Sequence, residues 1–150
     1  MVTIPYITVD DAQLYFDERL NTGAWDEASD DDRLKALKQA TRLINNLNFI
    51  GQKLDNTQPN EFPRLGQPTT PDCIGDATCE LALQLLDQVD PNLEIENIMA
   101  QSQGIATEKV SYARDFVLPQ IKAGIVSSEA WLLLLPYLNN PSMIDFTRVS

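Results

Sequence analysis

The stretch SDDDRLKALKQATRLINNLNFIGQKLDNTQPNEFPR, from Ser29 to Arg64, decides the fold, because it joins a self-capped helix to a long loop. Ser29 is a good N-cap, since its hydroxyl can accept a hydrogen bond from the first turn. The three aspartates that follow place negative charge at the positive end of the helix dipole. Apolar or small residues then recur every three or four positions, which predicts one buried stripe: Leu34, Leu37, Thr41, Ile44 and Leu47. We expect Gly51 to end this helix, because glycine adopts left-handed backbone readily.

The opposite face of this helix is basic. At about 100° per residue, Lys35, Lys38 and Arg42 fall together, away from the apolar stripe. This possible contact stripe has two interpretations. It binds phosphate or an acidic neighbouring subunit, or it is an ordinary solvated helix face.

Composition predicts one folded domain with an acidic surface. The chain has 150 residues, 43% of them hydrophobic, which is enough for a real core. Its formal net charge is −11. Such a chain repels nucleic acid and anionic membranes unless its basic side chains gather in one patch.

The sequence contains little of what catalysis needs. There is no histidine, which removes the commonest general base and metal ligand. Cys73 and Cys79 fall in one predicted helix, about 9 Å apart along its axis, so we expect both to be free thiols in a reducing compartment. Asp30, Asp31 and Asp32 point about 100° apart and cannot converge on one ion. We therefore expect no enzyme activity, no catalytic residue, no cofactor and no metal. We also expect no signal peptide and no membrane span.

The remaining segments predict further helices around the central stretch. Thr8 caps a first helix that should end near residues 21–23, and Trp25 should lie in the connection, with its N–H bonded to a backbone group. The loop from Phe49 to Pro71 should be ordered. Four residues are expected to pin that loop to the core: Phe49, Ile50, Phe62 and Leu65. A third helix should run from about residue 72 to 88, with an apolar face wide enough for the centre of a bundle.

The C-terminal half is less regular. Residues 93–99 could form a short helix or a packed loop, and the alternation in 105–116 predicts a strand or β-arm. Ser127 should cap a last helix that Pro136 kinks or ends. Residues 143–150 form a tail that could pair with another sheet as a strand, or fray as most termini do. The predicted fold is therefore all-α: a bundle of about four main helices with a long ordered loop, a possible β-arm and an extended tail.

A series of short motifs resembles a family of tailed-phage proteins. In order, these motifs are Tyr6-Ile7-Thr8, Trp25, ALKQAT at 36–41, FIGQK at 49–53, Phe62-Pro63-Arg64 and CELA at 79–82. Members of this family are labelled either head–tail connector (adaptor or head-completion) proteins or DnaT-like single-stranded-DNA-binding proteins. The resemblance covers most of residues 5–90 and continues loosely to the tail.

The resemblance implies a helical subunit of a ring, expected to be dodecameric, that sits beneath a portal protein in the virion. The ring extends the channel, through which DNA passes without sequence-specific binding, and it docks a neck or tail-completion protein. Phe62, Pro63 and Arg64 would belong to an inter-subunit loop. The portal-docking tail would comprise Ile144, Asp145, Phe146, Thr147, Arg148 and Val149. The corresponding division is a connector domain at 1–138 and a docking tail at 139–150.

The acidity of the chain favours the connector label. A channel that DNA slides through benefits from repelling phosphate, whereas a strand-binding protein uses a basic groove with stacking aromatics. Only 7% of the residues are aromatic, and most of them fall at predicted core positions. We therefore expect a structural adaptor made in the host cytoplasm and located at the head–tail junction. Single-stranded-DNA binding is the alternative.

Overall fold

Helix α4 (Asp72–Leu86) forms the centre of the fold in the computed structural model, which describes residues 3–87 and 123–139. The other helices pack against it or against each other. They are α1 (Val9–Asp17), α2 (Gly23–Glu27), α3 (Asp30–Asn45), α8 (Ser128–Leu134) and the 3-10 turn η2 (Leu135–Tyr137). The described residues contain five α-helices and only isolated β-bridges, which confirms the prediction of a small all-α bundle.

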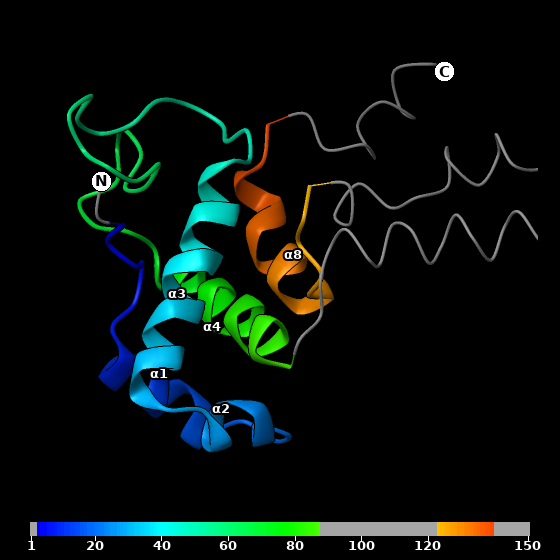
Figure 1. The fold of residues 1–150 in the computed structure, drawn as a ribbon. Helices are drawn as coiled ribbons and strands as arrows, with labels where there is room; N and C mark the ends of the chain where they lie inside the picture. The colour runs from blue at the N-terminus through cyan, green and yellow to red at the C-terminus, as the bar shows by residue number, and fades with distance from the viewer. Residues whose placement is uncertain (1–2, 88–122, 140–150) are drawn as a thin grey trace, which may run out of the picture.

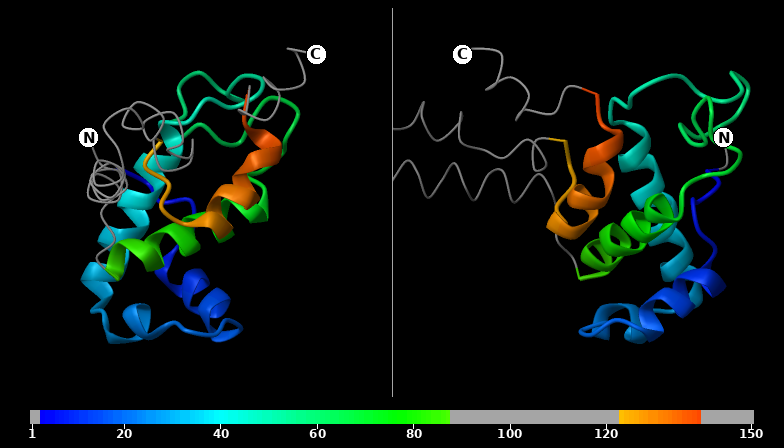
Figure 2. Two further views of the ribbon diagram at one scale, coloured as in Figure 1. Left: turned by 90° about the vertical axis from the view of Figure 1, so that its right-hand side faces the viewer. Right: turned by 180° about the vertical axis from the view of Figure 1, so that it is seen from behind.

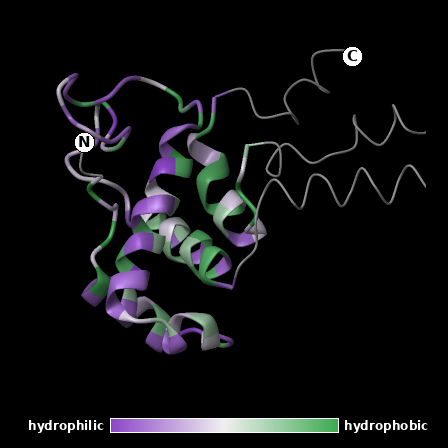
Figure 3. Cartoon of the chain, in the orientation of Figure 1, coloured by the Kyte–Doolittle hydropathy of each residue, from purple (hydrophilic) through white to green (hydrophobic). Residues whose placement is uncertain are grey.

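The helices are arranged so that the long loop lies at one end of the molecule. Helices α3 and α8 both pack on α4, and α1 and α2 lie at the opposite end from the loop of residues 46–71 (Figures 1 and 2). Hydrophilic residues dominate the outward side of α3, whereas α4 and α8 are mainly hydrophobic (Figure 3). This polarity agrees with a helix that covers the core with one side only.

The central position of α4 follows from its composition. Most side chains between Ile74 and Leu83 are buried, on every side of the helix. The apolar face of α4 is wide, and even the polar Thr78 and Glu80 are buried, so neighbouring elements enclose the helix. The predicted third helix and its wide apolar face are therefore confirmed.

Three predicted N-caps are present. The Thr8 hydroxyl accepts a hydrogen bond from the Asp11 amide at 3.2 Å, and the Ser29 hydroxyl accepts one from the Asp32 amide at 3.2 Å. The Ser127 hydroxyl accepts one from Ala130 at 3.1 Å. Pro136 acts as expected, because α8 ends at Leu134 and gives way to the 3-10 turn that contains the proline.

Two predicted helix ends are wrong. Helix α1 stops at Asp17, not near residues 21–23, because the amides of Glu18 and Arg19 bond to carbonyls only three residues back. Asn21 then turns the chain with a φ of 61°. Helix α3 ends at Asn45, well before Gly51, whose φ of 84° belongs to a turn inside the loop.

Trp25 also differs from the prediction. It lies inside α2, not in a connection, and its Nε1–H donates to the side-chain oxygen of Gln13 at 2.9 Å, not to a backbone group. The ring is fully buried against Phe16, with centroids 4.5 Å apart, and the Arg33 guanidinium lies 5.2 Å above it. The indole therefore joins α1, α2 and α3 at this end of the bundle.

Only two of the four residues expected to pin the loop do so. Phe49 and Phe62 are buried, but Ile50 is 57% exposed and Leu65 is 67% exposed. The reason is the extended backbone: Phe49 forms a β-bridge with Leu138, and Arg64 forms one with Lys53. Since successive side chains of an extended chain point to opposite sides, the residue after each inward one faces solvent.

Several predictions fall outside the described residues. These are the helix or packed loop at 93–99, the β-arm at 105–116 and the tail at 144–149. The division of the chain at residue 138 also remains a prediction.

Candidate interaction surfaces

Arg64 organises the loop from inside the chain. Its guanidinium is nearly buried and donates to the carbonyl oxygens of Phe49 at 3.4 Å, Ile50 at 3.2 Å and Gly51 at 2.5 Å. It also donates to the backbone carbonyl of Glu61 at 3.2 Å and to the carboxylate of the same residue at 3.0 Å. A planar fork with five donors suits this task better than a lysine. Arg64 thus holds the two ends of the loop together.

A second set of contacts fastens the loop to the N-terminal segment. The Tyr6 hydroxyl donates to the Asn45 side chain, and burial raises the pKa of Tyr6, so the hydroxyl stays protonated. The Asn45 amide group donates to Asn60, which in turn donates to the Ile4 carbonyl. The end of α3, the N-terminal segment and the loop therefore form one hydrogen-bonded unit.

Phe62 is the apolar centre of this unit. Its ring makes edge contacts with Phe49 at 4.7 Å, Tyr137 at 5.6 Å and Tyr6 at 6.1 Å between centroids. Edge-to-face pairs of this kind add to the benefit of burial. Of the residues that the resemblance assigns to an inter-subunit loop, Phe62 and Arg64 are turned into their own subunit and Pro63 is half-buried.

The outer side of the same loop is apolar. Backbone bonds from Leu54 to Pro63 at 3.0 Å and from Leu65 to Gln52 at 2.7 Å flank the bridge between Lys53 and Arg64. Because side chains alternate along each short strand, Leu54 and Leu65 share the face opposite Arg64. They are 43% and 67% exposed.

The basic stripe lies on α3, but its members differ. Lys35 is exposed and lies 3.0 Å from Asp31, whose hydrogen bond raises the pKa of the lysine. Arg42 is exposed and Lys38 is half-buried, and neither has a carboxylate partner within the described residues. No carboxylate of the described residues therefore competes with a partner for these two cations.

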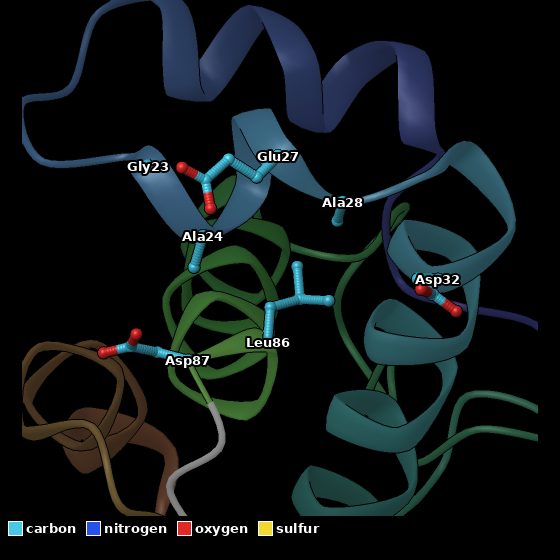
Figure 4. Close-up of a pocket in the computed structure, with 7 residues that line it drawn as sticks. All are labelled: Gly23, Ala24, Glu27, Ala28, Asp32, Leu86 and Asp87. Carbon is cyan, nitrogen blue, oxygen red and sulfur yellow. The ribbon is translucent and has the colours of Figure 1, made fainter.

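An acidic hollow lies at the other end of the molecule, between α2, the start of α3 and the end of α4. It has a volume of about 570 Å³, and its carboxylates are those of Glu27, Asp32 and Asp87. Figure 4 shows these three side chains set around Leu86. The described residues contain no group of carboxylates, thiols or imidazoles arranged to hold a metal ion. The sequence did not reveal the hollow, because its carboxylates come from three separate elements.

Glu80 is a second feature that the sequence analysis missed. It is 1% exposed, and one carboxylate oxygen accepts bonds from the Tyr15 hydroxyl and, at 2.7 Å, from Arg19. Arg19 also lies 3.7 Å from Glu129 of α8, so the cluster links α1, α4 and α8. The available signal was a glutamate inside CELA, within an otherwise apolar part of the helix.

The neighbouring thiol is unsuited to nucleophilic chemistry. Cys79 is buried, and burial together with the nearby Asp76 and Glu80 carboxylates raises its pKa, so it stays protonated. The reactive form of a cysteine is the thiolate. Cys79 is therefore a core residue, and Cys73 is also a free thiol, as predicted.

Comparison with known proteins gives one match. A family model described as "Putative DnaT-like ssDNA binding protein" matches residues 5–140. The chain belongs to this DnaT-like family. No curated protein and no solved structure matched it. The description contains one of the two labels that the sequence motifs suggested, and it does not mention phage connectors.

The described surface of this DnaT-like protein offers bases little to stack on. Every aromatic side chain in residues 3–87 and 123–139 is buried or half-buried. Proteins that bind single strands without sequence preference usually stack bases on exposed aromatic rings along a basic groove. No helix of the described part is long and apolar enough to cross a membrane.

Proposed function

We propose that the protein is a non-enzymatic structural subunit of a phage particle, a ring-forming adaptor at the head–tail junction. In this proposal the chain is made in the host cytoplasm and assembles beneath a portal protein. It extends the DNA channel and presents a site for a neck or tail-completion protein. The segment from Ile144 to Val149 docks into the portal.

One observation carries this proposal: the surface suits repelling DNA better than holding it. The chain has a net charge of −11, and within the described residues the aromatic rings are at least half covered. Most of the described cations are paired with carboxylates of the same chain. A channel lining that does not retain phosphate lets DNA slide, whereas a strand-binding groove must release counterions by contacting phosphates.

Single-stranded-DNA binding is the second candidate, and the family description supports it more directly than it supports an adaptor. In that case Lys38 and Arg42 of α3, which have no carboxylate partner in the described part of the chain, would contact phosphates. Two or three such contacts give only a modest, strongly salt-dependent affinity.

Two measurements separate the candidates. The first is capture of the chain by the portal protein of the same virus, compared with a variant that lacks residues 145–150. The adaptor proposal expects the truncated chain to keep its circular dichroism spectrum and to lose capture; unchanged capture would contradict it. The second is a fluorescence-anisotropy titration with a labelled single strand at low salt. Tight, salt-sensitive binding that Lys38→Ala/Arg42→Ala weakens would favour strand binding over the adaptor.

A further inference from the structure

Helix α3 carries two cations that have no carboxylate partner among residues 3–87 and 123–139. Five other basic side chains of the described residues lie within 4.0 Å of a carboxylate: Arg19, Arg33, Lys35, Lys53 and Arg64. Lys38 and Arg42 are the exceptions, and they lie four residues apart, on one side of the helix. In a chain with a net charge of −11, this pair of cations stands out from the other basic side chains of the described residues.

The same chain carries a surface of opposite charge. The acidic hollow presents Glu27, Asp32 and Asp87, all exposed, around the half-buried Leu86 (Figure 4). Its carboxylates do not converge as ligands of one metal ion. Separated carboxylates suit the longer cations of lysine and arginine, whose methylene stems can lie on an apolar residue such as Leu86 while their charged ends reach outward.

We propose that Lys38 and Arg42 of one copy dock on the acidic hollow of a second copy. This contact rests on the proposed function, because it supplies the subunit–subunit contact that a ring needs. It cannot form within one copy: Asp32 and Lys38 are both on α3, and six residues at about 100° each place them about 120° apart around the helix. The two surfaces are different parts of the chain, so the contact is head-to-tail. Such contacts close into rings or continue as filaments.

Charge complementarity also explains how copies of a chain with a net charge of −11 can associate. Random encounters of two such chains are repulsive. A patch of positive charge that meets a patch of negative charge steers the encounter and sets its orientation. The partner is therefore an acidic protein surface, and a second copy provides one.

The test uses two charge-reversed variants. Lys38→Glu/Arg42→Glu removes the basic face and keeps the hollow, whereas Glu27→Lys/Asp87→Lys reverses the hollow and keeps the basic face. Multi-angle light scattering should show self-association of the wild-type chain that weakens as salt rises. Each variant alone should associate at least about tenfold more weakly, since like charges now face each other.

Mixing the variants distinguishes a head-to-tail contact from general charge effects. One intact basic face and one intact hollow remain in the mixture, so at least a 1:1 dimer should form, and the two reversed surfaces, which are opposite in charge, do not oppose it. Asp10→Lys/Glu18→Lys is the matched control. It reverses two exposed carboxylates of the α1 region, outside the hollow, and leaves both docking surfaces intact, so it should self-associate like the wild type. Circular dichroism checks that every variant is folded.

Three results would overturn the proposal. They are a wild-type chain that stays monomeric at all concentrations, a mixture that stays monomeric, and a Lys38→Glu/Arg42→Glu variant that associates like the wild type. Loss of single-strand binding in that last variant, with association unchanged, would assign the two cations to DNA. Portal capture reports on the adaptor function separately: dimers in the mixture without portal capture would leave the contact standing and reject the adaptor.

Discussion

Replacing Arg64 by alanine tests whether one buried side chain holds the long loop to the helical body. The substitution removes donors to the carbonyls of Phe49, Ile50, Gly51 and Glu61. Ile50 and Gly51 are exposed residues, so water can replace the arginine there. Phe49 is buried and Glu61 is partly covered, so water replaces the arginine less well at their carbonyl oxygens, and these hydrogen bonds are lost.

The expected loss of stability follows from the hydrogen bonds that Arg64 donates to Phe49 and Glu61. A hydrogen bond to a charged group contributes about 1.5–3 kcal/mol net. If only the bonds to Phe49 and to Glu61 are counted, each at the lower value, Arg64→Ala should lower the free energy of unfolding by about 3 kcal/mol. For a chain of this length, that corresponds to a fall in Tm of about 6–12 °C.

Urea unfolding followed by circular dichroism measures the free energy, and hydrogen exchange locates the change. The Leu54 and Leu65 amides donate across the loop and the Ile50 amide donates to Tyr137 of η2, so their protection should fall more than that of α4. Lys53→Ala is the matched control, because it removes another cation bound to Glu61, at 3.4 Å, and should cost less than about 1 kcal/mol. Arg64→Lys keeps the charge without the fork and should recover less than half of the loss. A cost for Arg64→Ala below about 1 kcal/mol, or full recovery in Arg64→Lys, would refute the reasoning.

Four further substitutions test the rest of the structure. Ser29→Ala should cost about 1 kcal/mol in urea unfolding, because the Asp32 amide loses its cap; no change would show that the cap is dispensable. Tyr15→Phe should cost about 1–3 kcal/mol, because the buried Glu80 carboxylate loses a donor while its other oxygen already has no partner in the described residues. Phe62→Ala should cost about 3–5 kcal/mol and reduce helix content and loop protection together, as expected of a core residue; a loss confined to the loop would contradict this. Burial, with smaller contributions from Asp72 and Glu80, raises the pKa of Asp76 in the folded state. Asp76→Asn should therefore stabilise the protein by less than about 1 kcal/mol at pH 7, where the wild-type carboxylate is charged. That advantage should shrink as the pH falls toward the unfolded pKa of about 3.9, because both states then become protonated. A pH-independent difference in Tm would show that the charge of Asp76 is not the cause.

Local features of the chain could be predicted from the sequence. The hydroxyls of Thr8, Ser29 and Ser127 cap helices through bonds to residues three positions on, so the information lies within one turn. The centre of the fold was also predictable, because the apolar face of α4 is wide.

The orientation of the loop residues could not be predicted in the same way. Arg64 looks like a surface cation in the sequence, and it is buried because carbonyls from residues 49–51 and 61 meet around it. Those carbonyls are brought together by the fold, not by local spacing. Ile50 and Leu65 look like core residues, yet each follows an inward-facing residue of an extended segment and so faces solvent.

Inward and outward residues of this loop therefore have separable roles. Phe62 and Arg64 set the shape of the loop through contacts inside the subunit, so changing them alters stability first and any association only as a consequence. Leu54 and Leu65 contribute little to that shape, because much of each side chain is in water. Exposed apolar side chains cost a monomer little and gain energy when a partner covers them, at about 25 cal/mol per Å². A substitution of Leu65 that changes association but not the free energy of unfolding would locate a contact on the outer side of the loop. Phe62 and Arg64 hold the loop in shape from its inner side.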